Sequence, residues 1–225
     1  MLTSCYNADM ISAMIGFSAD PLTNGHLWMI QQGFKRFELN LAIAVNPDKK
    51  YTFTERERED MLSEALIGAL GDRAKEVHIH VIPHLYLARF AESTHCHLLL
   101  RGIRNDDDFK YERSIRHANA KLCPDVDTLY MIPPLELEAV SSSFVKGWIG
   151  PSGWEKEIIE YIPPVVYYAL LAKNHGSYYC YGVGGKMGKG CEAKLTQKEK
   201  IRVIKNNGGY CDKCIKEYET FMQSR

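Results

Sequence analysis

The sequence lacks any apolar run that approaches the roughly 18 residues needed to span a membrane. Its opening, Met1 to Cys5, has no basic segment followed by an apolar one, so no signal peptide is expected. No serine or cysteine has an obvious general base beside it in sequence, and no cluster of histidines has metal-ligand spacing. We therefore expect a cytoplasmic protein whose seven cysteines are mostly reduced or metal-bound.

The net charge is zero, but the basic and acidic residues are distributed unevenly along the chain. Residues 1–172 carry 17 Lys and Arg against 23 Asp and Glu, whereas residues 173–225 carry 11 against 5. The second segment also holds eight of the 17 glycines and four of the seven cysteines. This shift predicts a main domain over residues 1–173 and a small basic extension over residues 174–225.

Strand and helix patterns alternate through the main domain. Apolar runs predict five buried strands, and periodic or capped segments between them predict helices. Such alternation is typical of an α/β fold with a Rossmann-like, doubly wound, five-stranded parallel sheet. The strands are expected over residues 10–15, 39–45, 77–81, 97–100 and 129–132, the third nearer an edge. Helices are expected after Gly25, after Thr54, over residues 85–91 and 106–122, and at the close over residues 154–161 and 164–173.

The stretch 17–26 is predicted to be the turn between the first strand and the first helix. Thr23 or Asn24 is suited to cap that helix, and Gly25 lets a ligand approach the backbone closely. His26 then falls in the first helical turn, where unpaired N–H groups and the helix dipole favour an anion. The stretch therefore predicts a phosphate site.

Three further polar motifs follow predicted strands. Lys49 comes after the second strand, Arg101 and Arg104 after the fourth, and the serines 141–143 after the fifth. Because the carboxyl ends of parallel strands share one edge of the sheet, these motifs should meet His26 there. A basic set with two helix N-termini suits phosphoryl or nucleotidyl transfer, where catalysis is alignment plus stabilisation of phosphate charge. Taken singly, the lysine could be a solvated turn and the serines a simple helix cap.

The motifs resemble a known family. Thr23-Asn24-Gly25-His26 is similar to the (T/H)xGH signature of the nucleotidylyltransferase superfamily. The segment 100–104, Leu-Arg-Gly-Ile-Arg, with Asp108, Glu112 and Asn119 after it, resembles the IRGLR…DFEYE…N block of the phosphopantetheine adenylyltransferases. The segment 141–146, Ser-Ser-Ser-Phe-Val-Lys, resembles that family's ISSSxVR motif. The similarity runs from about Ile11 to Lys173.

This resemblance implies adenylyl transfer from ATP to 4′-phosphopantetheine, with Mg²⁺ accompanying ATP and commonly a hexameric homo-oligomer. It also implies roles by matching position. The reacting phosphates would be held by Ser18 and His26, the acceptor phosphate by Lys49, and the acceptor side by Arg101. The phosphates of ATP would be contacted by Arg104, Ser141, Ser142 and Ser143. The ribose of ATP would be contacted by Glu112. The pantetheine arm would be contacted by Leu85 and Asn119.

The sequence departs from the family's pattern beside the nucleotide. Phe17 stands where a glycine is usual, Ala19 where a bulky ring is usual, and Leu137 and Ala139 replace an aromatic pair. These changes leave open a relative that adenylylates another phosphorylated acceptor, such as nicotinamide mononucleotide. A non-catalytic nucleotide-binding protein is the other alternative, and the joint retention of the basic residues argues against it.

The extension carries Cys180, Cys191, Cys211 and Cys214, four thiols that could close a structural zinc site in a segment too small for its own core. Unrelated cysteines are the alternative. The glycine-rich residues 178–190 lack the strand-loop-helix context of a phosphate loop, so a flexible turn is favoured. A nucleic-acid partner is not expected, because ordinary surface lysines also explain the basic charge.

Overall fold

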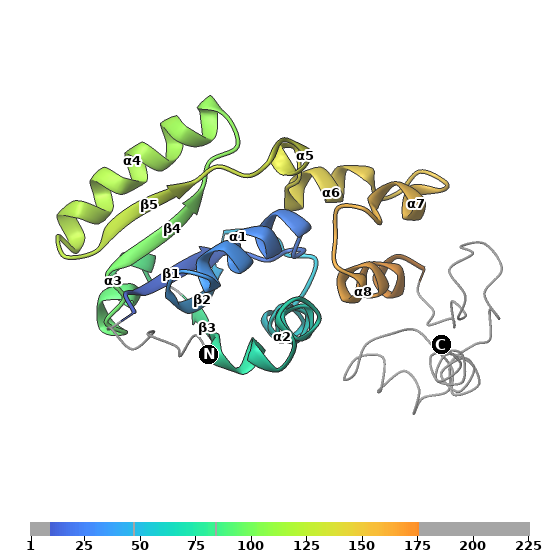
Figure 1. Cartoon of the computed structure of the whole chain (residues 1–225). Coiled ribbons are helices and arrows are strands. Elements are labelled where there is room, and N and C mark those ends of the chain that lie inside the picture. The colour runs from blue at the N-terminus through green and yellow to red at the C-terminus, as the bar shows by residue number, and fades with distance from the viewer. Residues whose placement is uncertain (1–9, 47, 84, 176–225) are drawn as a thin grey trace.

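A computed structural model describes residues 10–46, 48–83 and 85–175. Five parallel strands form one sheet in the order β3-β2-β1-β4-β5 (Figure 1). They are β1 (Ser12–Phe17), β2 (Glu38–Val45), β3 (His78–Pro83), β4 (Leu98–Gly102) and β5 (Asp127–Met131). The predicted fold class is confirmed, and β3 lies at an edge as expected.

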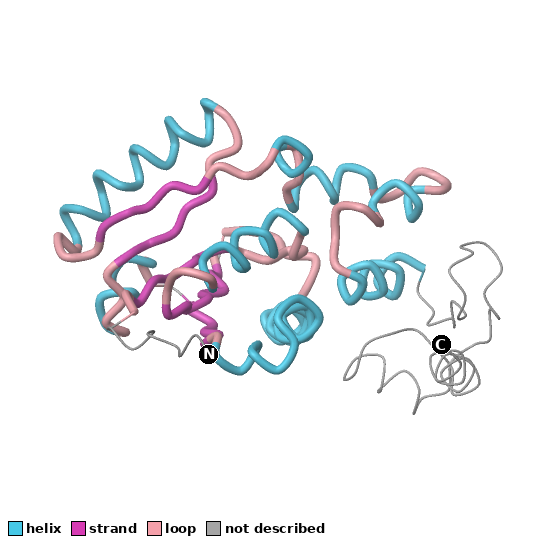
Figure 2. Tube along the Cα trace, in the orientation of Figure 1, coloured by secondary structure: helices cyan, strands magenta, loops and turns pink. Residues whose placement is uncertain are grey.

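The helices connect these strands and then continue past the sheet (Figure 2). The main connections are α1 (Asn24–Phe34), α2 (Glu55–Leu70) with the 3₁₀ turn η1 (Gly71–Glu76), α3 (Leu87–Ser93) and α4 (Asp106–Leu122). After β5 come α5 (Leu135–Glu138), α6 (Ser142–Trp148), α7 (Trp154–Ile158) and α8 (Pro164–His175). The predicted bounds of α4 are confirmed, whereas β1 starts two residues later than expected and includes Phe17.

Local sequence explains where the helices start. Thr54 caps α2 in a capping box, accepting from the Glu57 N–H while the Glu57 carboxylate accepts from the Thr54 N–H. Asn105 caps α4, whose first turn carries three aspartates that complement the positive end of the helix dipole. Gly71, at φ +60°, follows the last residue of α2 in a conformation that suits glycine.

The sheet separates two apolar cores. Side chains of β1 and β2 on one face pack with α1, α2 and the later helices α6 to α8, in a cluster that includes Ile15, Leu41, Leu62 and Val166. On the other face Met14 and its neighbours pack under α3 and the end of α4. Figure 1 shows α1 and α2 on one side of the strands and α3 on the other. Both faces are covered, as a parallel sheet requires.

Strand order reverses between β1 and β4, because β2 and β3 extend to one side of β1 and β5 extends to the other. Ligands of such sheets bind outside the carboxyl ends of the strands at this point. In the described residues no helix is both long and apolar enough to cross a membrane. The boundary predicted at residue 173 falls within α8, and the extension after residue 175 lies outside the described residues, so that division stays a prediction.

Candidate active site

A pocket of about 320 Å³ opens where the strand order reverses. Its walls come from the end of β1, the first turns of α1, the end of β4, the start of α4 and the segment around the serine motif. Of the predicted site residues, it is lined by Ser18, His26, Arg101, Arg104, Glu112, Ser141, Ser142 and Ser143. Residues from three motifs that are far apart in sequence therefore meet as predicted.

His26 lies at the third position of α1 and belongs to a capping box. Its Nδ1 accepts the Thr23 backbone N–H at 3.1 Å, while the Thr23 hydroxyl accepts the His26 N–H at 3.4 Å. Because a neutral imidazole that accepts at Nδ1 carries its proton on Nε2, this nitrogen remains as a donor. Burial, with a smaller effect of Arg104, lowers the pKa of His26 to about 4. His26 is therefore a neutral hydrogen-bond donor at pH 7.

The surroundings of His26 correct the expectation that the N–H groups of the first turn are unpaired. The His26 side chain is half-buried and takes part in the hydrogen bonds that start the helix. The N–H groups of the first turn are not all unpaired, since Asn24 donates to the Tyr161 carbonyl at 2.8 Å and His26 donates to Thr23. An anion at α1 would therefore rely on side-chain donors more than on the backbone.

Arg101 projects from β4 and is held on three sides. Its Nε donates to Glu112 Oε2 at 2.8 Å, its Nη2 to Glu112 Oε1, and its Nη1 to the Gly16 carbonyl at 2.9 Å. The side chains of Arg101 and Glu112 are 24% and 9% exposed. The ion pair fixes the guanidinium at the pocket wall, and it engages both carboxylate oxygens of Glu112.

Arg104 forms a second bidentate pair, with Asp108 one turn before Glu112 on α4. Its Nε and Nη2 donate to the two carboxylate oxygens at 2.7 and 3.0 Å, and its backbone N–H donates to Oδ2 at 3.2 Å. The hydrogen bonds from Arg104 hold the pKa of Asp108 below its ordinary value. Thus α4 carries two carboxylates that orient the two arginines of the pocket.

The serine motif closes the opposite wall against α1. Ser141 caps α6 by accepting the Phe144 N–H at 3.0 Å, and Ser142 Oγ donates to the Pro21 carbonyl at 2.8 Å. A Cβ on Gly25 would lie 3.2 Å from the Val140 carbonyl oxygen, so the glycine permits the close approach of α1 to this wall. The expected close approach at Gly25 thus involves the protein's own backbone as well as the pocket.

Three predicted site residues are not among those that line the pocket. Lys49 is exposed in the turn after β2, Leu85 is 58% exposed, and Asn119 lies beyond the second turn of α4. Their assignment to the acceptor therefore stays a prediction. The four cysteines predicted to bind zinc, at positions 180, 191, 211 and 214, lie outside the described residues.

Sequence reasoning missed the groups behind the turn at residues 18–21. Asp20, 2% exposed, accepts the N–H groups of Thr52 and Phe53 at 3.0 Å and pairs with Lys146 Nζ at 3.1 Å. Arg58 of α2 donates to the Ser18 carbonyl at 2.7 Å. The sequence gives little signal for these contacts, because Arg58 lies in a run of charged residues and the apolar neighbours of Asp20 do not identify a partner.

Comparison with known proteins then decides the family. The sequence model of the cytidylyltransferase-like family matches residues 14–147. A phosphopantetheine adenylyltransferase of Neisseria meningitidis serogroup C is 41% identical over 163 residues, which cover 72% of this chain and 93% of the relative. The chain belongs to the phosphopantetheine adenylyltransferase family. Another member, from Chromobacterium violaceum, is 42% identical over 164 residues, which cover 72% of this chain and 97% of the relative.

Solved structures agree at the level of the fold. The Plasmodium falciparum nicotinic acid mononucleotide adenylyltransferase complexed with APC superposes with a TM-score of 0.53 at 13% identity, covering 73% of this chain and 96% of that one. The same enzyme complexed with NaAD gives a TM-score of 0.50 at 15% identity. At such low identities the match supports the shared fold but says nothing about which acceptor this protein uses.

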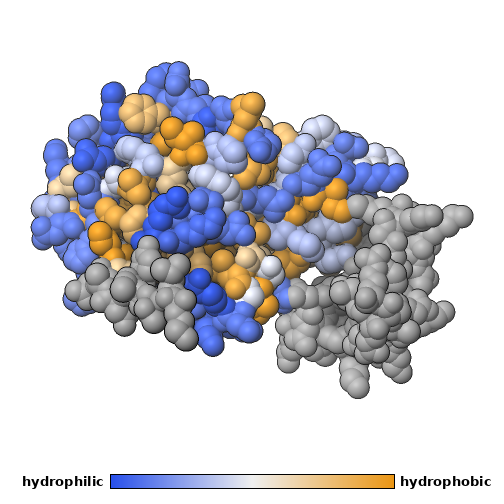
Figure 3. Space-filling model, viewed as in Figure 1, coloured by the Kyte–Doolittle hydropathy of each residue, from blue (hydrophilic) through white to orange (hydrophobic). Residues whose placement is uncertain are grey.

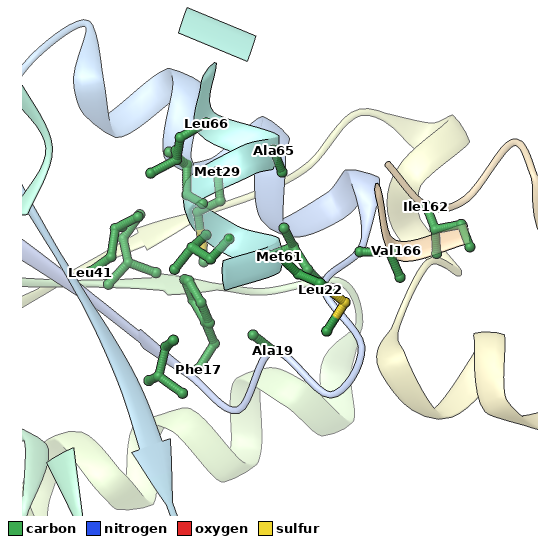
Figure 4. Packing of buried hydrophobic residues seen from close by; sticks show 14 of the residues in the cluster. Phe17, Ala19, Leu22, Met29, Leu41, Met61, Ala65, Leu66, Ile162 and Val166 are labelled. Atoms are coloured by element: carbon green, nitrogen blue, oxygen red, sulfur yellow. The ribbon is translucent and has the colours of Figure 1, made fainter. Parts of the chain in front are cut away.

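Two of the departures from the phosphopantetheine adenylyltransferase pattern, Phe17 and Ala19, are buried. Phe17 is 8% exposed and packs in the core, with its ring centroid 5.3 Å from that of His26. Ala19 is fully buried in the same cluster, at φ +50° (Figure 4). The large ring at position 17 therefore belongs to the core and also lines the pocket, as Leu137 does.

Proposed function

We propose that the protein transfers the adenylyl group of ATP to 4′-phosphopantetheine, forming dephospho-coenzyme A and pyrophosphate. An oxygen of the acceptor phosphate attacks the α-phosphorus, and the bond from that phosphorus to the α–β bridging oxygen breaks. The observation that carries the proposal is a pocket with two fixed arginines and a neutral histidine donor, in a chain 41% identical to named members of the family. Arginines and hydrogen-bond donors placed in this way stabilise the negative charge of phosphate groups during phosphoryl transfer.

The residues on the ATP side of the pocket would bind different phosphates according to their position. His26 would donate from Nε2 to a phosphate oxygen, and Ser18 would contact the reacting phosphates beside it. Arg104 and the segment 141–143 would bind the triphosphate. Since the Ser141 and Ser142 side chains already hold Phe144 and Pro21, their backbone N–H groups are the donors that this role would use.

The acceptor would lie toward Arg101 and Lys49. Arg101 lines the pocket, and the exposed ammonium of Lys49 would bind the acceptor phosphate as it enters. Leu85 and Asn119, outside the pocket walls, would contact the extended pantetheine arm. Glu112 would reach the ATP ribose only if it shared its carboxylate with Arg101, which engages both oxygens.

Mg²⁺ would enter with the triphosphate. Across residues 10–46, 48–83 and 85–175, no group of three His, Cys, Asp or Glu side chains is arranged to hold an ion, so its ligands would be chiefly phosphate oxygens. The ion would offset phosphate charge, and the arginines would offset the remainder. We also propose that the protein is a homo-oligomer, as the family resemblance implies, which light scattering would measure.

Pyrophosphate release from ATP tests the reaction directly. The purified protein should release pyrophosphate with 4′-phosphopantetheine, and dephospho-coenzyme A should appear in equal amount by mass spectrometry. Nicotinamide mononucleotide and a reaction without acceptor are the matched controls, and both should give only background. Turnover with nicotinamide mononucleotide but not with 4′-phosphopantetheine would show that the proposed acceptor is wrong. No turnover with any acceptor would refute catalysis.

A further inference from the structure

Arg58 is a buried charge that the proposed chemistry does not use directly. It lies on α2, is 1% exposed, and its Nη1 donates to the Ser18 carbonyl at 2.7 Å. Its Nε has no hydrogen-bond partner within the described part of the chain. Burial of a guanidinium is costly unless its hydrogen bonds compensate. Its position therefore indicates a specific task at the turn that carries Ser18.

Tyr51 connects Arg58 with a second loop. The guanidinium carbon of Arg58 lies 4.2 Å from the centroid of the Tyr51 ring, within cation–π range. The Tyr51 hydroxyl accepts the Asn46 N–H at 2.8 Å, and in the same turn the Lys49 N–H donates to the Asn46 carbonyl at 3.1 Å. An unbroken series of contacts thus runs from Ser18 to the turn that carries Lys49.

We propose that Arg58 and Tyr51 are positioning residues that hold the ATP side and the acceptor side of the site in register. Neither is among the residues that line the pocket, so each acts through the main chain it contacts. This rests on the proposed function, in which Ser18 serves the reacting phosphates and Lys49 the acceptor phosphate. Attack in line with the leaving group requires the two to be aligned, and a misplacement of about 1 Å can lower the rate about 100-fold.

The Tyr51→Phe variant tests the link to the acceptor side, because it removes one hydroxyl and keeps the ring beside Arg58. We expect the KM for 4′-phosphopantetheine to rise about tenfold, with the Kd of ATP, measured by calorimetry, unchanged. Since the lost hydrogen bond is exposed to water, the Tm should stay near that of the wild type.

The Arg58→Lys variant tests the link to Ser18, because it keeps the charge but loses the planar group. We expect kcat to fall about 10- to 100-fold. The matched control is Arg56→Lys on the same helix, at a side chain that is 78% exposed, and it should retain wild-type kinetics. In the Tyr51→Phe/Arg58→Lys double variant the loss in kcat/KM should be smaller than the product of the two single losses, since both substitutions interrupt one link.

Wild-type kinetics for Tyr51→Phe, or independent multiplicative effects of the two substitutions, would overturn the inference. If Arg58→Lys does not fold, Tyr51→Phe decides alone. The proposed function fails separately: the wild-type protein would then release no pyrophosphate with 4′-phosphopantetheine, whatever the variants do.

Discussion

The Glu112→Gln substitution tests how much the Arg101–Glu112 pair stabilises the domain. Glutamine keeps the shape but places an amide donor against the guanidinium and removes the negative charge. Breaking a fully buried ion pair costs about 3–5 kcal/mol. Because Arg101 is 24% exposed and water can reach it in part, we expect about 2–3 kcal/mol. For a domain of this size that lowers the Tm by about 4–12 °C, which a thermal unfolding scan measures.

The matched control for this prediction is Glu76→Gln. Arg73 and Glu76 form the same bidentate geometry, at 2.9 and 3.0 Å, but their side chains are 65% and 45% exposed. Exposed pairs contribute little, so the Tm should hardly change. Equal losses of Tm in the two variants would refute the reasoning from burial. Replacing the whole pair, with Arg101→Met and Glu112→Leu together, should recover part of the lost Tm while activity stays low.

Four further outcomes are expected. His26→Ala should lower kcat about 100-fold or more in the pyrophosphate assay, because a phosphate donor is lost; it should also cost about 1 kcal/mol in denaturant unfolding, because the capping box is lost. The His26 imidazole, followed by NMR, should not titrate near pH 6.5, since its pKa is about 4, and the free energy of unfolding should fall as pH drops from about 6.5 toward 4, where the unfolded histidine binds a proton first. A His26 resonance that titrates around pH 6.5 would contradict this assignment. Lys49→Ala should raise the KM of the acceptor more than the Kd of ATP, and a change in ATP affinity alone would oppose the division of roles. Elemental analysis should find about one zinc per chain, lost in Cys211→Ser/Cys214→Ser, and a metal-free tail that resists protease would reject the zinc site.

The sequence predicted the fold well because apolar runs and helix caps are local signals. Thr54 and Glu57, three residues apart, mark the start of α2, and the acidic residues at the start of α4 mark that helix in the same way. Strand ends have no such local signal. Phe17 is predicted to lie in the functional turn, yet it is the last residue of β1, packs in the core and also lines the pocket, because an apolar ring beside a polar motif is compatible with both places.

The site was predicted by residue type and place, whereas its internal partners were not. The rule that ligands bind at the carboxyl ends of parallel strands brought His26, Arg101 and Arg104 together. It could not show that Asp108 and Glu112 each neutralise one arginine, or that the Ser142 hydroxyl donates to Pro21. Such pairings depend on side-chain directions across elements that are distant in sequence.

The two walls of the pocket would present different problems to an inhibitor. The wall of α1 and the serine motif is joined by the close approach of Gly25 to the Val140 carbonyl and by the hydrogen bond from the Ser142 hydroxyl to the Pro21 carbonyl. The opposite wall, α4, has Glu112 as its one buried residue and a hydrophilic surface (Figure 3). A compound shaped to the first wall would meet a preformed template, whereas an anionic group directed at the arginines would have to compete with the carboxylates of α4 and would loosen that helix. Affinity gained on the first side should therefore be less sensitive to salt than affinity gained on the second.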